Sequence, residues 1–591
     1  MKELEYPFDK NYILSKKKSI KRQLLSQNTK FTEKRIAILG GSTTNDIKAL
    51  LDLFLLNIGI KAEFYESEYN KYYEDAMFDP AELVEFKPDV IFIHTTSVNI
   101  KAFPSVRDSV SEVQDKLETV YSEFERMWAH LSEVYHCPII QNNFEYPNVR
   151  LLGNSDAVNI HGKVNFINRL NARFADYAAT YDNFYIHDIN YLAARIGLDN
   201  FFDPFYWYMY KYAVAVPAIA EFSYSLSHII KAIYGKNKKA FVLDLDNTLW
   251  GGIVGDDGPE NLEIGKETAE GEAFLAFQEY IKSHKDIGVL LNVSSKNEEE
   301  NALAGLNHAE GALKPEDFTL IKANWEPKAV NVQTIADELS LGVDSFVFVD
   351  DNPAEREIVE ANIKGIAVPA ITSSDKYMRD IDRHGYFEVL KLSDDDLSRN
   401  EMYKANIKRA ETMKSFVDYG EYLKSLEMKA VIKPFEPVYM ARIAQLTNKS
   451  NQFNLTTKRY SQAEIEEAAQ NRLTFYGKLS DKFGDNGVVT VAIGRVEGTI
   501  CHMELWLMSC RVLKRDMELA LLDEIVHTCK EHGVTQIRGY YYPTAKNAMV
   551  KEFYKGLGFD KVAEDENGNT EWSLDISGNY EDRNKVIAIE K

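Results

Sequence analysis

The first 235 residues alternate between short apolar runs and helical stretches. Apolar runs typical of buried strands occur at 35–39, 90–94 and 138–140, and an apolar helical segment spans 47–58. Strands that alternate with helices favour a parallel α/β sheet. The pattern breaks at Gly235, which opens the string G-K-N-K-K. We therefore predict a first α/β domain over residues 1–235.

A second series of the same kind begins with the apolar run 240–243. Phe274, Phe277 and Ile281 then recur at spacings of three and four, as on the buried face of a helix. Further strand-like runs lie at 287–293, 318–321, 346–349 and 366–368. This series predicts a second α/β domain, with a Rossmann-like parallel sheet, over residues 236–393.

The pattern changes after this second series. The string S-D-D-D-L at 393–397 resembles a capped helix start, and a charged helical connector follows it. Beyond Lys429, strands are predicted at 488–493, 499–507 and 536–541, around an amphipathic helix at 516–531. The third domain, with its connector, is therefore predicted as α+β over residues 394–591.

Length and composition narrow the class of protein. The chain has 591 residues, which suits about three or four domains. Its 69 Lys and Arg against 91 Asp and Glu give a formal net charge of −22, which argues against nucleic acid or an anionic membrane as a partner. No apolar run approaches the roughly 18 residues of a membrane span, and the first residues lack a signal-peptide core. We expect a cytoplasmic protein.

The number and spacing of the cysteines argue against a zinc-binding protein and a disulfide-rich protein. The four cysteines, at 137, 501, 510 and 529, include no C-x-x-C pair. That spacing is typical neither of a zinc site nor of a disulfide framework.

Two carboxylates follow the predicted strand 240–243. Asp244 and Asp246 leave its carboxyl end, which is where open α/β sheets bind their ligands. Their mutual repulsion favours a cation between them, so one carboxylate could bind Mg²⁺ and attack phosphorus while the other moves a proton. The alternative for an isolated D-x-D is a solvated acidic turn.

Three further strand ends carry complementary groups. Ser294 or Ser295 ends the strand near 293 and could donate a hydrogen bond to a phosphate. Lys328 could balance phosphoryl charge, and Asp350 with Asp351 could complete an oxygen-rich Mg²⁺ site. In this order, at successive strand ends, these residues favour one catalytic site over separate acidic turns.

The motifs resemble those of the haloacid dehalogenase (HAD) phosphatase superfamily. The strings are D-L-D-N-T, S-K-N, W-E-P-K and D-D-N-P-A-E-R, and W-G-G-I-V-G-D-D-G at 250–258 is similar to the FkbH-like branch. The resemblance implies that Asp244 is the nucleophile that forms an aspartyl phosphate and that Asp246 is the general acid/base. It implies phosphate binding by Ser295 and Lys328. It also implies a metal site that includes Asp244 and Asp246 and is completed by Asp350 or Asp351.

The spacing of these motifs leaves no room for a cap domain. Between Asp246 and Ser295 a turn, one helix and a strand fit, and the 33 positions from Ser295 to Lys328 are too few for a domain. The predicted site is therefore open, and suits a macromolecular substrate or a roof from a neighbouring domain.

The third domain extends the resemblance to FkbH-like proteins. The strings at 448–460, 481–487, 508–512 and 543–547 are similar to that family, and the element order resembles the N-acetyltransferase (GNAT) fold. FkbH-like proteins with this pairing are associated with loading a glyceryl unit from 1,3-bisphosphoglycerate onto an acyl carrier protein, with dephosphorylation. The resemblance extends to Cys510 as a thiol that holds the acyl group.

The chemistry around Cys510 is consistent with that role. Arg511, Lys514 and Arg515 follow it and would favour the thiolate, although a structural cysteine is the alternative. Lys514 and Asp516 stand where GNAT loops carry glycines, which argues against ordinary coenzyme A binding. A pantetheine arm on a carrier protein is less affected.

The first domain resembles SGNH-type hydrolases at one motif. G-G-S-T follows the strand 35–39 and puts Ser42 in the position of the serine nucleophile. The late D-x-x-H motif is missing, because Tyr206 stands where the histidine should follow Asp203. We therefore predict a degenerate SGNH-like domain.

The sequence thus favours a Mg²⁺-dependent HAD phosphatase and acyltransferase. It would dephosphorylate a phosphorylated three-carbon acyl unit and load it onto an acyl carrier protein. The alternative is a plain HAD phosphatase that acts on a small phosphorylated metabolite, with non-catalytic flanking domains. The expected partners are a phosphorylated small molecule and a carrier protein.

Overall fold

The computed structural model describes residues 1–27, 31–450, 452–544 and 546–590. The chain divides into two compact units, Met1–Lys236 and Asn237–Lys591. Two residues of the strings singled out above, Asn451 and Ala545, lie outside the described residues. Among the helices that are described, none is long and apolar enough to cross a membrane.

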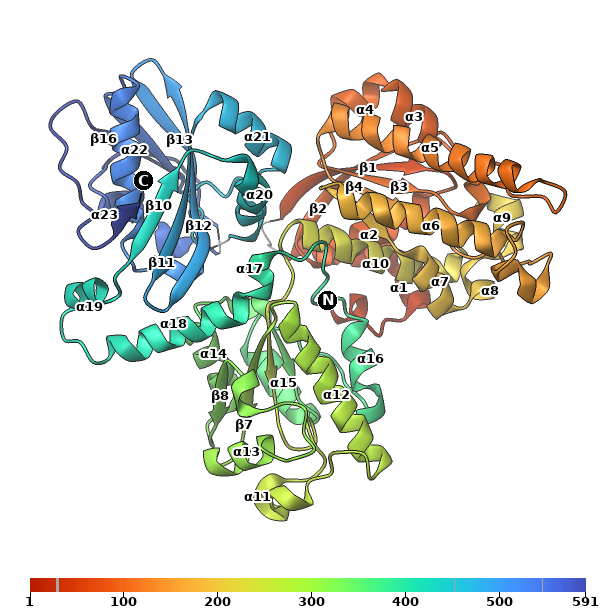
Figure 1. Cartoon of the computed structure of the whole chain (residues 1–591), viewed down its shortest axis with the longest axis horizontal. Helices are drawn as coiled ribbons and strands as arrows, with labels where there is room; N and C mark the ends of the chain where they lie inside the picture. The colour runs from red at the N-terminus through yellow and green to blue at the C-terminus, as the bar shows by residue number, and fades with distance from the viewer. Residues whose placement is uncertain (28–30, 451, 545, 591) are drawn as a thin grey trace. The chain divides into compact units, whose positions relative to one another are not determined.

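A five-stranded parallel sheet forms the centre of the first unit (Figure 1). Its strands, in spatial order, are β2 (Ile60–Glu66), β1 (Thr32–Gly40), β3 (Val90–His94), β4 (Ile139–Asn142) and β5 (Phe184–His187). The helices are α1 (Lys10–Ser26), α2 (Asn45–Asn57), α3 (Tyr72–Phe78), α4 (Ala81–Phe86), α5 (Val110–Tyr135), α6 (Lys163–Thr180), α7 (Ile189–Ile196), α8 (Leu198–Phe201), α9 (Pro204–Tyr210) and α10 (Val216–Ile233). The predicted parallel α/β architecture is confirmed.

Near-continuous apolar strands explain why helices cover this sheet. Ala37 and Leu39 of β1 pack in one buried cluster with residues of α5 and α6, and α2 packs against α10. Ile36 and Ile38, which alternate with them along β1, are fully buried as well. A strand buried on both faces is typical of a parallel sheet between helical layers.

The middle region, the first part of the second unit, contains a smaller parallel sheet. Its order is β8 (Leu320–Ala323), β7 (Leu290–Ser295), β6 (Ala240–Leu243) and β9 (Phe346–Val349). Its helices are α11 (Val254–Asp257), α12 (Ala269–Asp286), α13 (Glu299–Leu306), α14 (Lys328–Glu338), α15 (Pro353–Asn362) and α16 (Tyr377–Asp382). The predicted strand at 366–368 is wrong in extent, because only Ala367 forms an isolated bridge, to Val347.

Strand connections in the middle region are short. The connection from β6 to β7 holds α11, a 3-10 turn and α12, and that from β7 to β8 holds α13 and a 3-10 turn. All residues of these connections are described, and neither connection contains a separate cap domain. The carboxyl ends of the strands are therefore not covered by an inserted domain.

The C-terminal region forms a mixed eight-stranded sheet. The order is β15 (Asp560–Glu564), β16 (Thr570–Asp575), β14 (Gln536–Tyr541), β13 (Ile500–Met508), β12 (Gly484–Glu497), β11 (Leu473–Asp481), β10 (Lys429–Lys433) and β17 (Ala588–Glu590). Residues of α22 (Met517–Glu531) pack in one buried cluster, and those of α20 (Met440–Lys449) and α21 (Gln462–Asn471) pack in another. The remaining helices are α19 (Tyr419–Ser425) and α23 (Phe553–Gly556). Helices on an extended mixed sheet agree with the α+β prediction.

A segment of the family-like string 448–460 fills a gap in this sheet. β13 and β14 pair in parallel only between 500–502 and 536–538. Beyond that point, Leu455 donates its N–H to Trp506 (3.1 Å) and accepts from the N–H of Tyr542 (2.8 Å). The diverging strands are therefore bridged by the chain itself.

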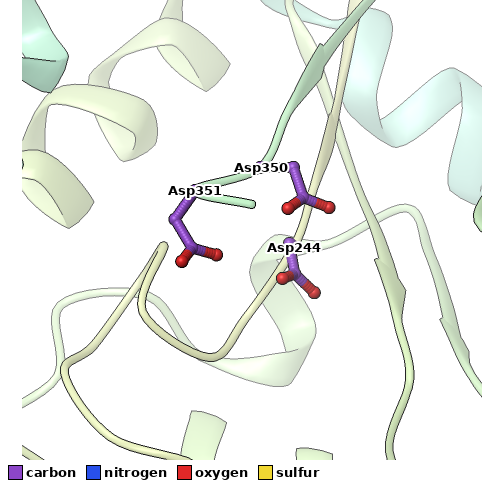
Figure 2. Close-up of side chains that lie close together, drawn as sticks. All are labelled: Asp244, Asp350 and Asp351. Atoms are coloured by element: carbon purple, nitrogen blue, oxygen red, sulfur yellow. The ribbon is translucent and has the colours of Figure 1, made fainter. Parts of the chain in front are cut away.

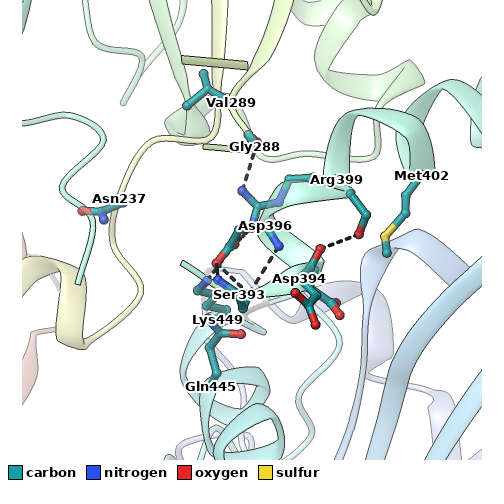
Figure 3. Close-up of polar contacts among 12 residues, drawn as sticks. Asn237, Gly288, Val289, Ser393, Asp394, Asp396, Arg399, Met402, Gln445 and Lys449 are labelled. Atoms are coloured by element: carbon teal, nitrogen blue, oxygen red, sulfur yellow. Dashed lines mark hydrogen bonds and ion pairs between the residues drawn. The ribbon is translucent and has the colours of Figure 1, made fainter. Parts of the chain in front are cut away.

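The connector consists of α17 (Asp394–Leu397) and α18 (Arg399–Met413), which contact both parts of the second unit. Asp396 pairs with Arg399 and with Lys449 of α20, and Arg399 donates to the carbonyl of Gly288 at 3.0 Å (Figure 3). Further along α18, Arg409 makes two hydrogen bonds to Asp481, at 2.8 and 2.6 Å. Both of these side chains are almost completely buried, at 3% and 0% exposure.

Removing the Arg409 guanidinium would leave a buried carboxylate with less compensation. We expect Arg409→Leu to lower the free energy of unfolding of the second unit by about 3 kcal/mol, the lower end for a broken buried ion pair, because Arg515 still contacts Asp481 at 3.2 Å. The exposed pair Lys424–Glu421 provides a control, since Lys424→Met should cost at most about 0.5 kcal/mol. Urea denaturation of both variants measures the difference, and equal costs would contradict the argument.

Candidate active site

The candidate site lies at the carboxyl ends of three neighbouring strands. Leu243 pairs in register with Val293 and with Val349, so the residues that follow these strands lie at one edge of the sheet. Figure 2 shows Asp244, Asp350 and Asp351 grouped at this edge. Each offers one carboxylate oxygen, and these atoms all lie within 4.8 Å of one another.

Lys328 links two of these carboxylates. Its Nζ lies 2.9 Å from Oδ2 of Asp244 and 2.5 Å from Oδ2 of Asp350. All three side chains are buried, with exposures below a tenth. Lys328 begins α14, so the helix start aims the ammonium group at the strand ends.

Burial and charge together shift the pKa values of this group. Burial raises the pKa of Asp244 to about 7, and the neighbouring Asp350 adds to this effect while Lys328 opposes it. Burial also raises the pKa of Asp351, again reinforced by Asp350. Burial alone would lower the pKa of Lys328, but Asp244 and Asp350 raise it above its usual value.

One ammonium group does not balance three carboxylates. A divalent cation with a preference for oxygen ligands fits this donor set, and Mg²⁺ is such a cation. Asp244, Asp350 and Asp351 are therefore the residues that could hold it.

Asp246, also predicted as a metal ligand, has a different environment. Its Oδ1 accepts from Nε1 of Trp250 and from the backbone N–H of Val254, both at 3.0 Å, and its Oδ2 accepts from Nδ2 of Asn297 at 2.8 Å. Its carboxylate does not belong to the three-carboxylate group found among the described residues. Donors on both oxygens fix its orientation, which suits a group that transfers protons.

The two candidate serines lie on alternate faces at the end of β7, and both are buried. Ser295 Oγ accepts from Nδ2 of Asn297 at 3.1 Å, in the same network as Asp246. Ser294 Oγ has no hydrogen-bond partner among the described residues. The network favours Ser295, whose role in phosphate binding stays a prediction.

Three residues around the site were not assigned from the sequence. Asn297 joins Asp246 to Ser295, Thr248 Oγ1 accepts from the N–H of Asp351 at 3.0 Å, and Arg356 donates to the carbonyls of residues 350 and 351 at 2.5 and 2.7 Å. All three stand inside the quoted motifs. Their closeness in sequence to the motif carboxylates is the signal that could have indicated a place in the site.

Cys510 lies elsewhere. It begins a 3-10 turn after β13, and its Sγ lies 3.7 Å from the hydroxyl of Tyr403 on α18. It packs against an apolar cluster that includes Ala240 of β6 and Phe346 of β9, the residues that begin these strands. Asp244 follows the opposite end of β6, about 13 Å away for four residues of strand. The structure therefore does not bring Cys510 to the group around Asp244.

The first unit places a histidine beside Ser42 that no sequence motif indicates. Ser42 Oγ lies 2.9 Å from Nε2 of His94, which ends β3, and both residues are buried. Tyr206 lies in α9, and Asp203 caps that helix by accepting from the N–H of Phe205. Tyr206 therefore occupies the position expected for the late histidine.

The hydrogen-bond directions around His94 argue against activation of Ser42. Nδ2 of Asn142 donates to the carbonyl of Thr95 (3.1 Å) and lies 3.0 Å from Nδ1 of His94, so Nδ1 is the acceptor. Nε2 then carries the hydrogen and donates it to Ser42, which is the wrong tautomer for a general base. Burial also lowers the pKa of His94 to about 3.

We therefore expect Ser42 to be unreactive. A fluorophosphonate probe incubated with the intact protein should add no mass at this serine, because no base removes its proton. Intact and peptide mass spectrometry measure the labelling, with an active serine hydrolase as the positive control. Stoichiometric labelling that is lost in Ser42→Ala would contradict the assignment of the tautomer.

Comparison with known proteins gives two kinds of match. Residues 35–231 match the model of the FkbH N-terminal domain. No curated protein matches the chain. Among solved structures, the N-terminal part of BF1531 from Bacteroides fragilis, which contains a phosphatase domain and was complexed with Mg, is 28% identical. This match covers 64% of this chain and 99% of that chain, with a TM-score of 0.58.

Two acetyltransferase structures give more distant matches. The ribosomal-protein-S18-alanine N-acetyltransferase from Escherichia coli is 16% identical, over 26% of this chain and 99% of that chain, with a TM-score of 0.21. Ard1 from Thermoplasma volcanium is 18% identical, over 25% of this chain and 97% of that chain, with a TM-score of 0.20.

Proposed function

We propose that this FkbH-like chain is a Mg²⁺-dependent phosphatase of the HAD type, which passes a phosphoryl group from its substrate to Asp244 and then to water. The observation that carries the proposal is the group of Asp244, Asp350 and Asp351 around Lys328 at the carboxyl ends of parallel strands. The Mg complex of the BF1531 phosphatase-containing structure supports the choice of metal.

In the first proposed step, a carboxylate oxygen of Asp244 attacks the phosphorus of a phosphomonoester. The new bond joins this oxygen to phosphorus, and the bond from phosphorus to the ester oxygen breaks. Asp246 gives its proton to the departing oxygen, for which its fixed orientation between Trp250, Val254 and Asn297 is suited. The result is an aspartyl phosphate and a free alcohol.

In the second step, water attacks the phosphorus of the aspartyl phosphate. Asp246 takes a proton from this water, and the bond from phosphorus to the Asp244 oxygen breaks to release phosphate. Lys328 and the Ser295 hydroxyl would hold the phosphoryl oxygens in both steps. Bound Mg²⁺ supplies positive charge that offsets the repulsion between the phosphate and the carboxylates.

The first test removes the attacking anion. Asp244→Asn keeps the size of the side chain but not its nucleophilicity, so kcat for p-nitrophenyl phosphate should fall by at least about 10³-fold. Phosphate release with and without Mg²⁺ measures the effect, and removal of Mg²⁺ by EDTA should inactivate the parent protein. Asp182→Asn, in the first unit, is a matched control that should retain activity. Mg²⁺-dependent turnover by Asp244→Asn close to that of the parent would contradict the proposal.

We further propose that the phosphatase acts in an acyl transfer, in which a phosphorylated three-carbon acyl unit is loaded onto an acyl carrier protein. The motifs of the C-terminal region and Cys510 support this extension. The separation between Cys510 and Asp244 means that one bound acyl unit cannot touch both at once in this conformation, so transfer needs a mobile arm. The alternative is a plain phosphatase for a small metabolite, favoured by the packing of Cys510 beside Tyr403.

Cys510→Ala separates these two functions. If the thiol carries the acyl group, the variant should form no acyl adduct with 1,3-bisphosphoglycerate, while its hydrolysis of p-nitrophenyl phosphate should stay within about twofold of the parent. Intact mass spectrometry detects the adduct. Cys137→Ala is a control for loss of a buried thiol. An undiminished adduct in Cys510→Ala would exclude this thiol as the carrier and favour the plain phosphatase.

A further inference from the structure

The strand-end segments that carry the candidate site are poor in cations. Residues 244–250, 294–298, 324–328 and 350–356 together contain seven carboxylates. Their cationic side chains are three, Lys296, Lys328 and Arg356. A phosphomonoester that carries a second anionic group would need one of these cations to be available.

Each of the three cations is already engaged. Lys328 is buried between Asp244 and Asp350. Arg356 uses its guanidinium on the backbone carbonyls of residues 350 and 351, at 2.5 and 2.7 Å. Lys296 is the most exposed of them, and its Nζ lies 2.6 Å from Oε1 of Glu355 at the start of α15.

Besides Lys296, acidic and aromatic side chains are exposed beside the site. Trp325 is 68% exposed, and its Nε1 donates to Oε1 of Glu298 at 2.6 Å. Glu298 follows Asn297, which contacts Asp246, and Trp325 precedes Lys328 by three residues. Glu326 adds another exposed carboxylate to the same loop. A substrate body that enters here meets negative charge and an aromatic face.

We infer that the site selects phosphomonoesters whose remaining part is uncharged or cationic, and discriminates against a second anionic group. This inference rests on the proposed phosphatase function. The phosphoryl group itself is matched by Lys328 and the metal site, whereas the strand-end segments around it add the carboxylates of Glu298 and Glu326, and Glu355 neutralises Lys296. A phosphorylated three-carbon acid should therefore be a better substrate once its carboxylate is converted to an ester or thioester.

A matched pair of substrates tests the inference. 3-Phosphoglycerate and its methyl ester differ in the charge of one carboxyl group and share the phosphoryl group. We expect kcat/KM to be about tenfold higher for the methyl ester, the effect of one unfavourable unit charge at short range. The ratio should shrink in 0.5 M NaCl, because salt screens exposed charges. Equal kcat/KM values for the two compounds would overturn the inference.

Two variants of α15 test whether Lys296 is the cation that Glu355 keeps from a second anionic group of the substrate. Glu355→Gln removes the carboxylate that pairs with Lys296, so kcat/KM for 3-phosphoglycerate should rise by at least about threefold, with little change for the ester. Glu357→Gln removes the same charge from the same helix at an exposed position and should leave the ratio nearly unchanged. Equal effects of both variants would overturn the assignment to Lys296.

Failure of the proposed phosphatase function and failure of this selectivity inference give different experimental results. An absence of Mg²⁺-dependent hydrolysis of p-nitrophenyl phosphate by the parent protein would overturn the phosphatase proposal, and this inference with it. Hydrolysis of p-nitrophenyl phosphate without discrimination between the matched pair would overturn the inference alone.

Discussion

The contacts of Lys328 with Asp244 and Asp350 are the interaction on which the candidate site depends. Two buried carboxylates and a half-buried one repel one another at this sheet edge, and a buried charge is costly unless it is paired. Lys328 compensates part of this charge and leaves room for a divalent cation. Because Lys328 begins α14 while Asp244 and Asp350 follow β6 and β9, the site exists only when these elements are packed together.

The balance between cations and carboxylates in the site also affects which phosphorylated substrates it accepts. The cations of the site contact its carboxylates and the backbone carbonyls of residues 350 and 351, so few positive charges are left to face a substrate. An open site without a cap domain could admit many phosphorylated compounds. Its acidic surroundings narrow that range to compounds without a second anionic group, which fits an acyl unit held as an ester or thioester.

Much of the fold was predictable from local pattern. Apolar runs beside helical stretches identified the strands that carry Asp244, Ser295 and Asp350, and parallel pairing then brings their ends together. The contacts of Asn297 and Arg356 could not be predicted, because they depend on loop geometry. The hydrogen bond from His94 to Ser42 joins two strand ends 52 residues apart. It could not be predicted, because no sequence motif links these two residues. The environment of Cys510 depends on how α18 packs, which local pattern does not determine.

The central claim is that phosphate passes through a covalent bond to Asp244. Borohydride reduces an acyl phosphate to an alcohol, so quenching a reaction during turnover should convert the aspartate at position 244 to homoserine. Peptide mass spectrometry of the quenched protein locates the change. We expect homoserine at position 244, and its formation should require both Mg²⁺ and the phosphomonoester. Phosphate release without reduction at position 244, or with reduction at another carboxylate, would contradict it.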